Sequence, residues 1–528
     1  MSSLKKFSPA ENTPLMLMIL DGWGIADANR GNAIALAKTP VIDSLLEKYP
    51  NTKLFAHGKY VGLPSKQVGN SEAGHMNIGA GRLVEQDAVK ISRSIEDGTF
   101  FKNSAFLGAI RHVRKMNSRM HVMGMLSNGQ SPHSDPGHLL ALLSLLKKNK
   151  IENVYLHLFT DGRDSPKYAS LQLIDDLQKN FFNNEKIVTV MGRFYAMDRK
   201  KKWERTESAY KALVLGKGKR ALSAQSAITE SYNRGESDEY IEPYIIGKDK
   251  DQDSRIKDGD SVIFFNLRSD RGRQLAKVFV QNDFQRMNPG TFVREKILEH
   301  LYFVAMTDFG PDLDEILTAF PGIDLEMTLP MCLKDLRQIY LAETEKYAHV
   351  TYFFNGGYSG RVAGEDQFMV DSPDVKSYDQ TPAMSSGLLA KKAIESLVRE
   401  QGVSQYDFTL LNFAAPDMVG HTGNLEAAIK CCEAVDSCVG KICEAYLRAN
   451  GTVVITADHG NIEEMINLET GEIYTEHTTN QVPFAVIGKN FNKKIKFRKN
   501  GVLGDIAPTI LKILNIKKPK EMSGRSLY

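Results

Sequence analysis

Cysteine is scarce in this chain, with 5 residues among 528. Four of them, Cys431, Cys432, Cys438 and Cys443, fall within one segment of helical pattern and lack the paired spacing of a zinc site. The odd total and the clustering are both typical of reduced thiols that pack as small apolar side chains in a cytosolic protein. We therefore assign the cysteines no chemistry and expect a cytoplasmic protein.

Long apolar runs and an excess of charge are also missing. The apolar run from Leu15 to Leu20 is too short to span a membrane, and no small-residue cleavage site follows it. A net charge of +3 gives no general case for binding nucleic acid or a membrane surface. We therefore expect no targeting segment, no nucleic-acid partner and no membrane partner.

What the chain does have is an alternation of short apolar runs and longer helical patterns along almost its whole length. This alternation is the signature of an α/β architecture. At 528 residues the chain is too long for a single hydrophobic core, so two or more domains are expected.

Polar residues follow most of the apolar runs, and their chemistry changes along the chain. Runs in the first sixth and the last third end in Asp, His or Ser, whereas runs in the middle end mostly in Arg. Open α/β sheets bind ligands at the carboxyl ends of their strands, so these positions point to binding sites. We expect a metal-binding domain of residues 1–82 with 313–528, and an inserted substrate-binding domain of residues 83–312.

The outer segments carry a set of candidate metal ligands. The set is Asp21, Asp417, His421, Asp458, His459 and His477. Asp417 and His421 are four residues apart, which places both on one face of a helical turn. A single histidine is more often satisfied by hydrogen bonds than by a metal, but several such placements at strand ends are hard to assign to structure alone. Oxygen and imidazole donors favour manganese, zinc or cobalt over magnesium, and enough donors exist for two ions.

Ser71 stands in a glycine-rich loop, between Gly69 and Gly74, that leads into a helical pattern. The free N–H groups and the dipole of a helix start favour negative charge, so this serine has two interpretations. Either it caps the helix, or it attacks phosphorus as a nucleophile whose pKa is lowered. Two-metal sites clamp the attacking and leaving oxygens in displacements at phosphorus, and a divalent ion beside Ser71 would favour loss of its proton.

Five arginines lie at or just after the middle apolar runs. They are Arg163, Arg193, Arg199, Arg268 and Arg271. Guanidinium groups match carboxylate and phosphate geometry, so several in one cleft predict a small, multiply charged anion, although a single loop arginine is more often a surface residue. Asp164 is either the salt-bridge partner of Arg163 or a general base toward a substrate hydroxyl. Lys346 is either an exposed lysine or a point charge for a phosphoryl group, and the apolar run 349–354 after it is expected to be a strand.

With these residues assembled, the chain resembles the cofactor-independent phosphoglycerate mutases of the alkaline phosphatase superfamily over its full length. The motifs that carry the resemblance are Leu20-Asp21-Gly22-Trp23-Gly24, Gly69-Asn70-Ser71-Glu72-Ala73-Gly74-His75, Asp161-Gly162-Arg163-Asp164, Met191 to Arg199, Asn266 to Gln274, Glu345 to Thr351, Pro416 to Gly423 and Ala457 to Asn461. So many matches in the same order make a chance coincidence implausible.

The resemblance implies two α/β domains, an alkaline-phosphatase-like domain that holds two manganese ions and an inserted transferase domain. One implied metal site consists of Asp417, His421 and His477, and the other of Asp21, Ser71, Asp458 and His459. Ser71 would become phosphoserine, with Asp164 and Lys346 as further catalytic residues. The implied phosphoglycerate ligands are His133, Arg163, Asp164, Arg193, Arg199, Arg268, Arg271 and Lys346. The implied enzyme is a monomer that interconverts 3-phosphoglycerate and 2-phosphoglycerate in glycolysis and gluconeogenesis, without 2,3-bisphosphoglycerate.

The chain departs from the family at two places. One is Ala415, which stands where an asparagine often precedes the Pro-Asp pair. At the other, the family commonly has Gly-Gly-Val-His-Ser-His where this chain has Gly129-Gln130-Ser131-Pro132-His133-Ser134-Asp135, with one extra residue and no second histidine.

Two other functions compete with the mutase reaction. A phosphatase would use the same serine and metals with water as acceptor, but a hydrolase has no need of arginines that retain the alcohol. A non-catalytic, metal-dependent binding protein is the alternative from another class.

Overall fold

A computed structural model of the chain describes residues 13–129, 131–182, 185–248, 254–310, 312, 313, 316–322, 324–397 and 404–528. The chain divides into two compact units, each built around its own sheet. Unit 1 contains Met1–Gln86 and Ile323–Tyr528, and unit 2 contains Asp87–Gly322. The expected fold class, one α/β unit inserted into another, is therefore confirmed. The functional domains expected from the sequence, 1–82 with 313–528 and 83–312, stay a prediction.

The sheet of unit 1 has the strand order β12-β11-β13-β1-β14-β15-β2-β16. Its strands are β1 (Leu15–Leu20), β2 (Asn51–Phe55), β11 (Gln338–Glu343), β12 (Asp366–Val370), β13 (Phe408–Phe413), β14 (Thr452–Thr456), β15 (Val482–Ile487) and β16 (Gly501–Val502). β1 runs parallel to both β13 and β14, and all residues of these three strands are buried. Continuous apolar runs suit such central strands, because both faces of a parallel sheet are covered.

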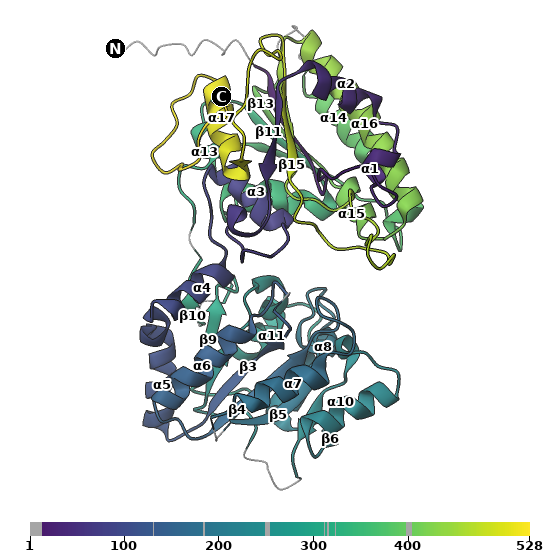
Figure 1. Cartoon of the computed structure of the whole chain (residues 1–528). Coiled ribbons are helices and arrows are strands. Elements are labelled where there is room, and N and C mark those ends of the chain that lie inside the picture. The colour runs from purple at the N-terminus through teal and green to yellow at the C-terminus, as the bar shows by residue number, and fades with distance from the viewer. Residues whose placement is uncertain are drawn as a thin grey trace, which may run out of the picture. The chain divides into compact units, whose positions relative to one another are not determined.

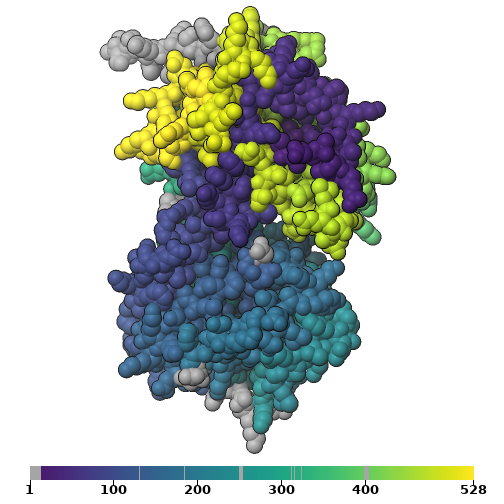
Figure 2. Space-filling view, viewed as in Figure 1, coloured from purple at the N-terminus to yellow at the C-terminus, as the bar shows by residue number. Residues whose placement is uncertain are grey.

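Helices cover both faces of this sheet (Figure 1). On one face lie α1 (Ala33–Leu36), α2 (Pro40–Lys48) and α14 (Ser386–Glu395), each of which contacts the long helix α16 (Leu425–Arg448). On the other face lie α3 (Ser71–Ala80), α13 (Leu329–Cys332) and α17 (Ile506–Ile513). Figure 2 shows that unit 1 combines the two ends of the chain, with purple and yellow-green segments side by side. The four cysteines of α16 are buried free thiols, as the sequence predicts.

The sheet of unit 2 has the strand order β10-β9-β8-β3-β4-β5-β7-β6, and only the β5–β7 pair is antiparallel. Its strands are β3 (Met120–Leu126), β4 (Val154–Thr160), β5 (Glu185–Gly192), β6 (Lys219–Ala221), β7 (Tyr244–Ile246), β8 (Ser261–Phe264), β9 (Tyr302–Thr307) and β10 (Leu317–Phe320). Alternate side chains of β3 enter two different cores, since Val122 packs on one face and Met123 on the other. The period of two along a strand explains this division.

Two groups of helices cover those cores. The first consists of α4 (Asp87–Glu96), α5 (Ser104–Met116), α6 (Pro136–Lys148), α7 (Ser170–Lys179) and α10 (Ala224–Asn233). The second consists of α8 (Arg193–Ala196), α9 (Trp203–Tyr210), α11 (Ser269–Val280) and α12 (Phe284–Met287). Among the described residues, none of the helices combines the length and the apolar character needed to cross a bilayer.

One expected strand is wrong. The apolar run 349–354 forms the helical turn η7 (His349–Phe353) instead. Val350 and Phe354, four residues apart, are both fully buried, whereas Tyr352 between them is exposed. Burial therefore follows the helical period rather than the alternation of a strand. Lys346 accordingly lies in the turn η6 (Thr344–Lys346), directly after β11.

Candidate metal centre and anion-binding site

Ser71 is the first residue of α3, but it does not cap that helix. The N-cap is Asn70, whose side-chain oxygen accepts a hydrogen bond from Ala73 N at 2.9 Å. The interpretation of Ser71 as a capping residue is therefore wrong. Its buried hydroxyl instead lies 2.7 Å from Lys346 Nζ, 2.9 Å from His459 Nε2 and 3.2 Å from Asp21 Oδ1. A helix start with a neighbouring ammonium is a favourable place for negative charge.

The register of the central strands brings the candidate ligands together. β1 pairs with β14 up to Ile19 and Thr456, so Asp21 and Asp458, each two residues further on, leave the sheet side by side. Asp21, Asp458 and His459 form one group of buried donors whose atoms lie within 4.8 Å of one another. These residues lie at the carboxyl ends of parallel strands, which is where open α/β sheets bind ligands.

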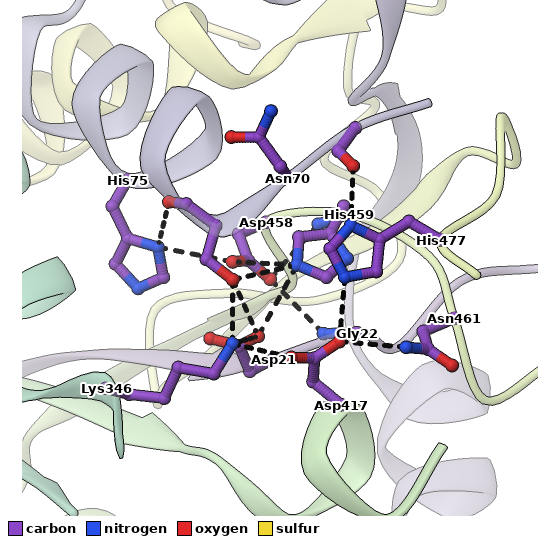
Figure 3. Close-up of polar contacts among 12 residues, drawn as sticks. Asp21, Gly22, Asn70, His75, Lys346, Asp417, Asp458, His459, Asn461 and His477 are labelled. Carbon is purple, nitrogen blue, oxygen red and sulfur yellow. Dashed lines mark hydrogen bonds and ion pairs between the residues drawn. The ribbon is translucent and has the colours of Figure 1, made fainter. Parts of the chain in front are cut away.

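A second group of donors shares His459 with the first. Asp417, in α15 (Ala415–Gly420) after β13, groups with His459 and His477. Asp417 Oδ1 lies 3.2 Å from His477 Nε2 and 3.3 Å from His421 Nε2. All seven residues predicted as metal ligands therefore lie in one cluster of unit 1, most of which Figure 3 shows.

The two outer histidines are oriented by backbone carbonyls. Nδ1 of His421 contacts Thr475 O at 2.8 Å, and Nδ1 of His477 contacts Gly69 O at 2.8 Å. Because a carbonyl only accepts, Nδ1 must carry the proton, and Nε2 of each ring faces Asp417. Such a hydrogen bond from Nδ1 to a carbonyl fixes the tautomer of a histidine and leaves Nε2 free to bind a metal.

Lys346 reaches into the middle of the cluster (Figure 3). Its side chain is buried, with Nζ 2.7 Å from Asp21 Oδ1 and 2.6 Å from Asp417 Oδ2, so the alternative of an exposed lysine is wrong. Burial alone would lower the pKa of this ammonium, but the Asp21 and Asp417 carboxylates outweigh it and raise the pKa. Lys346 is therefore a permanent positive charge beside Ser71.

One lysine does not balance the negative charge of this cluster. Asp21, Asp417 and Asp458 are all buried carboxylates. Burial and the neighbouring Asp458 carboxylate raise the pKa of Asp21, even though Lys346 is close. Buried carboxylates in excess, together with imidazoles and a hydroxyl, are a donor set that suits divalent transition metals. The residues present therefore fit a metal centre.

Sequence reasoning missed the residues that hold these ligands in place. His75 Nδ1 lies 3.2 Å from Asp458 Oδ2, Asn412 Nδ2 donates to Asp21 Oδ2 at 2.7 Å, and Asn461 Nδ2 donates to Asp417 Oδ1 at 2.9 Å. Two signals were present in the sequence. His75 is four residues after Ser71 on the same helix, and Asn412 is an amide inside the apolar run of β13.

A second cluster of predicted site residues lies in unit 2, at the carboxyl ends of β3, β4, β5 and β8. Arg193, almost fully buried, places Nη1 2.5 Å from Asp161 Oδ1 and 2.6 Å from Asp164 Oδ2. Asp164 Oδ2 also accepts from Ser131 Oγ at 3.0 Å. Burial would raise the pKa of Asp164, but Arg193 outweighs it and lowers the pKa. Asp164 is thus an ionised carboxylate with fixed partners.

His133 belongs to this cluster despite the altered motif. It is buried, and burial lowers its pKa to about 4, against the opposing charge of Asp270. Ser131 Oγ accepts from His133 N at 3.2 Å, and the carboxylate of Asp135 caps α6. Gln130, the remaining unusual residue of this segment, lies outside the described residues.

Two of the other arginines pair with Asp270, and the charges of Asp270 and Arg163 both act on Arg271. Arg199 Nη1 is 2.7 Å from Asp270 Oδ2, and Arg268 Nε is 3.9 Å from Asp270 Oδ1. Burial, followed by the charges of Arg193 and Arg199, lowers the pKa of Arg271 to about 10. Arg163 adds to this field and also pairs with Glu239 at 3.7 Å. An arginine whose pKa is lowered by burial and by neighbouring guanidinium groups lies where positive charge is in excess, which favours an anion as ligand.

Comparisons with known proteins agree with this chemistry. The chain matches the metalloenzyme superfamily over residues 13–518. It is 47% identical to the 2,3-bisphosphoglycerate-independent phosphoglycerate mutase of Clostridium kluyveri over 518 residues, which cover 97% of this chain and 99% of that protein. It is also 47% identical to mutase 1 of Methanosarcina barkeri over 522 residues, with 97% and 98% covered. The phosphoglycerate mutase of Leishmania mexicana, solved at low cobalt concentration, superposes with a TM-score of 0.81 at 28% identity, covering 99% of this chain and 98% of that one.

Proposed function

Since the chain belongs to the family of 2,3-bisphosphoglycerate-independent phosphoglycerate mutases, as its motifs predict, we propose that it interconverts 3-phosphoglycerate and 2-phosphoglycerate through a phosphoserine on Ser71. The observation that carries this proposal is the position of the Ser71 hydroxyl, which contacts Lys346, His459 and Asp21 at the start of α3. A serine with these neighbours is equipped as a nucleophile rather than as a capping residue.

The metal centre would consist of two divalent ions. Asp21, Ser71, Asp458 and His459 would hold one ion, and Asp417, His421 and His477 the other. When bound, the ions supply Lewis-acid stabilisation of charge at phosphorus and lower the pKa of the serine hydroxyl. Manganese is our choice of metal, and the oxygen and imidazole donors also suit cobalt and zinc.

The residues of unit 1 would act directly on the phosphoryl group. Ser71 Oγ loses its proton and forms a bond to phosphorus, while the bond between phosphorus and the oxygen of the acid breaks and that oxygen takes up a proton to become a hydroxyl. In the return step the receiving hydroxyl loses its proton, and Ser71 Oγ regains one as its bond to phosphorus breaks. Lys346 Nζ, already 2.7 Å from Ser71 Oγ, offsets the charge that develops on the phosphoryl oxygens. The N-terminal end of α3 adds free N–H groups near the same charge.

The residues of unit 2 would retain the acid. Arg163, Arg193, Arg199, Arg268 and Arg271, with His133, would bind its carboxylate and its phosphate. Asp164, held as an ionised carboxylate by Arg193 and Ser131, would take the proton of the receiving hydroxyl. Because Ser71 would carry the phosphoryl group between the two steps, the reaction would need no 2,3-bisphosphoglycerate as a phosphoryl donor. The enzyme would serve glycolysis in one direction and gluconeogenesis in the other.

The nearest alternative is a phosphatase, and the two functions differ in their products. We would incubate the manganese-loaded protein with 3-phosphoglycerate and measure 2-phosphoglycerate and free phosphate together. The mutase reaction predicts 2-phosphoglycerate with little free phosphate, while predominant phosphate release would reject it. Acid quenching followed by peptide mass spectrometry should find a phosphate on Ser71. Ser71→Ala should abolish both the adduct and the isomerisation.

A further inference from the structure

The carboxylate of Glu463 has an unusual set of partners. The residue is fully buried, three positions after Gly460 and close to the candidate ligands Asp458 and His459. Its Oε2 accepts hydrogen bonds from Gly24 N at 3.0 Å and Asn461 N at 2.8 Å.

The other oxygen of Glu463 is equally occupied. Its Oε1 accepts from Asn480 Nδ2 at 3.0 Å and from the hydroxyl of Thr478. All four donors are neutral, and within the part of the chain that the structure describes no cationic side chain pairs with Glu463. A buried charge without a countercharge is costly, so these hydrogen bonds must hold it in place.

The four donors come from three separate segments, and each segment carries candidate metal ligands. Gly24 belongs to the segment after β1 that begins with Asp21. Asn461 belongs to the segment after β14 that carries Asp458 and His459. Thr478 and Asn480 follow His477 in the loop before β15. One carboxylate therefore joins all three segments.

The backbone around Glu463 is shaped to let this carboxylate approach. A Cβ atom on Gly24 would lie 2.2 Å from the carboxylate carbon of Glu463, and one on Gly460 would lie 2.3 Å from its Oε1. A side chain at either position would displace the carboxylate, so the two glycines leave the space that Glu463 occupies. The contact also extends to Asp417, because the side chain of Asn461 donates to that carboxylate.

We propose that Glu463 is a positioning residue of the metal centre, which fixes the three segments that present Asp21, Asp458 with His459, and His477. This inference rests on the proposed metal centre. A carboxylate suits these partners, because each of its oxygens accepts two hydrogen bonds. The NH2 group of a glutamine would face two backbone N–H donors in one orientation and the Asn480 Nδ2 donor in the other.

The test compares Glu463→Gln with Glu464→Gln. Glu464 is the neighbouring carboxylate, half-buried, and it also accepts from Asn480 Nδ2, at 3.2 Å. Manganese titrations of each purified protein, followed by the electron paramagnetic resonance signal of free Mn²⁺, give the affinity without using activity. We expect Glu463→Gln to bind Mn²⁺ roughly 10-fold more weakly than wild type, the lower end of the range for residues that orient metal ligands, because Glu463 acts on the ligands through the backbone. Glu464→Gln should bind normally. Wild-type affinity in Glu463→Gln would overturn the proposal.

Thermal unfolding separates positioning from a merely structural role. A structural role lowers the Tm of chelated and manganese-loaded protein equally, whereas a positioning role shrinks the rise in Tm that Mn²⁺ causes. If Glu463→Gln does not fold, Asn480→Ala removes one donor and leaves the carboxylate. It should still bind Mn²⁺ several-fold more weakly, and unchanged affinity would reject the proposal. Absence of Mn²⁺ binding in wild type would instead reject the metal centre itself.

Discussion

The ammonium of Lys346 lies 2.7 Å from the hydroxyl of Ser71 and bridges it to two carboxylates that arrive from different strands. Asp21 follows β1 and Asp417 follows β13, while Lys346 itself follows β11. The lysine thus connects the nucleophile that we propose with both groups of metal ligands. A charge held this firmly has no reorganisation to undergo as negative charge develops.

Replacing this lysine should therefore remove catalysis more than folding. We expect Lys346→Met to lower kcat by at least about 100-fold, the usual loss when one electrostatic donor to a transition state is removed. Lys334→Met, at an exposed lysine of the same unit, is the matched control and should retain wild-type turnover. Turnover of Lys346→Met within threefold of wild type, in folded and manganese-loaded protein, would exclude the role assigned to the ammonium.

Removing the metal should destabilise the protein as well as inactivate it. Chelation leaves the carboxylates of Asp21, Asp417 and Asp458 buried together with Lys346 as their shared ammonium. Binding to the folded state alone contributes about 2.7 kcal/mol when free metal is 100 times its Kd. We therefore expect the Tm measured by scanning fluorimetry to fall with EDTA and to rise with added Mn²⁺. A Tm that stays the same at every Mn²⁺ concentration would contradict the two-metal proposal.

The sequence was sufficient to predict the fold class and the main clusters, because both follow from local patterns. Apolar runs ending in Asp, His or Arg mark the carboxyl edge of a parallel sheet, where such residues gather. The role of Ser71 could not be decided in this way. The residues around Ser71, taken alone, are more typical of a helix cap, and only the structure shows that Asn70 caps the helix.

The supporting residues were beyond sequence reasoning for a related reason. Glu463 accepts hydrogen bonds from Gly24, 439 positions away, and from Asn480, 17 positions away across a loop. No rule of sequence spacing connects these residues. The same holds for Asn412, whose partner Asp21 lies 391 positions away. Contacts between segments that are remote in sequence appear only once the strand order is known.

The proposed substrate site offers a test in which the effects on substrate binding and on protein stability should separate. Arg271 Nη1 donates a hydrogen bond to Met197 O at 3.3 Å. The positive charges of Arg193 and Arg199 disfavour the positive charge of Arg271. Arg271→Gln should therefore raise the KM for 3-phosphoglycerate, by about 10-fold or more for a lost charged hydrogen bond, without lowering the Tm.

The control for this variant is Arg286→Gln. Arg286 is exposed and pairs with Asp283, three residues away, so its loss should change neither quantity. Steady-state kinetics and thermal melts of both variants give the comparison. A wild-type KM in Arg271→Gln would show that Arg271 does not bind the substrate.

A pH dependence of stability should arise from Glu343, at the end of β11. This side chain is fully buried, with Oε1 accepting from Ser385 N at 3.1 Å, and burial raises its pKa from 4.5 to about 7. Between pH 4.5 and about pH 7, Glu343 is therefore protonated in the folded protein and ionised in the unfolded chain. The stabilisation from this proton is complete below pH 4.5 and is lost as the pH rises through about 7. The difference amounts to roughly 3 kcal/mol at 1.36 kcal/mol per pKa unit.

Glu343→Gln should remove this slope, because the amide stays neutral and has nearly the same shape. We would measure the free energy of unfolding in urea at pH 5 and pH 8, in wild type and variant, with chelator present so that metal binding does not contribute. The loss between the two pH values should be smaller in the variant by about 2–3 kcal/mol. Glu345→Gln is the control, because that exposed neighbour on the same turn should leave most of the slope in place. Equal slopes in wild type and Glu343→Gln would show that Glu343 is ionised in the folded protein, with its charge satisfied by its hydrogen bonds.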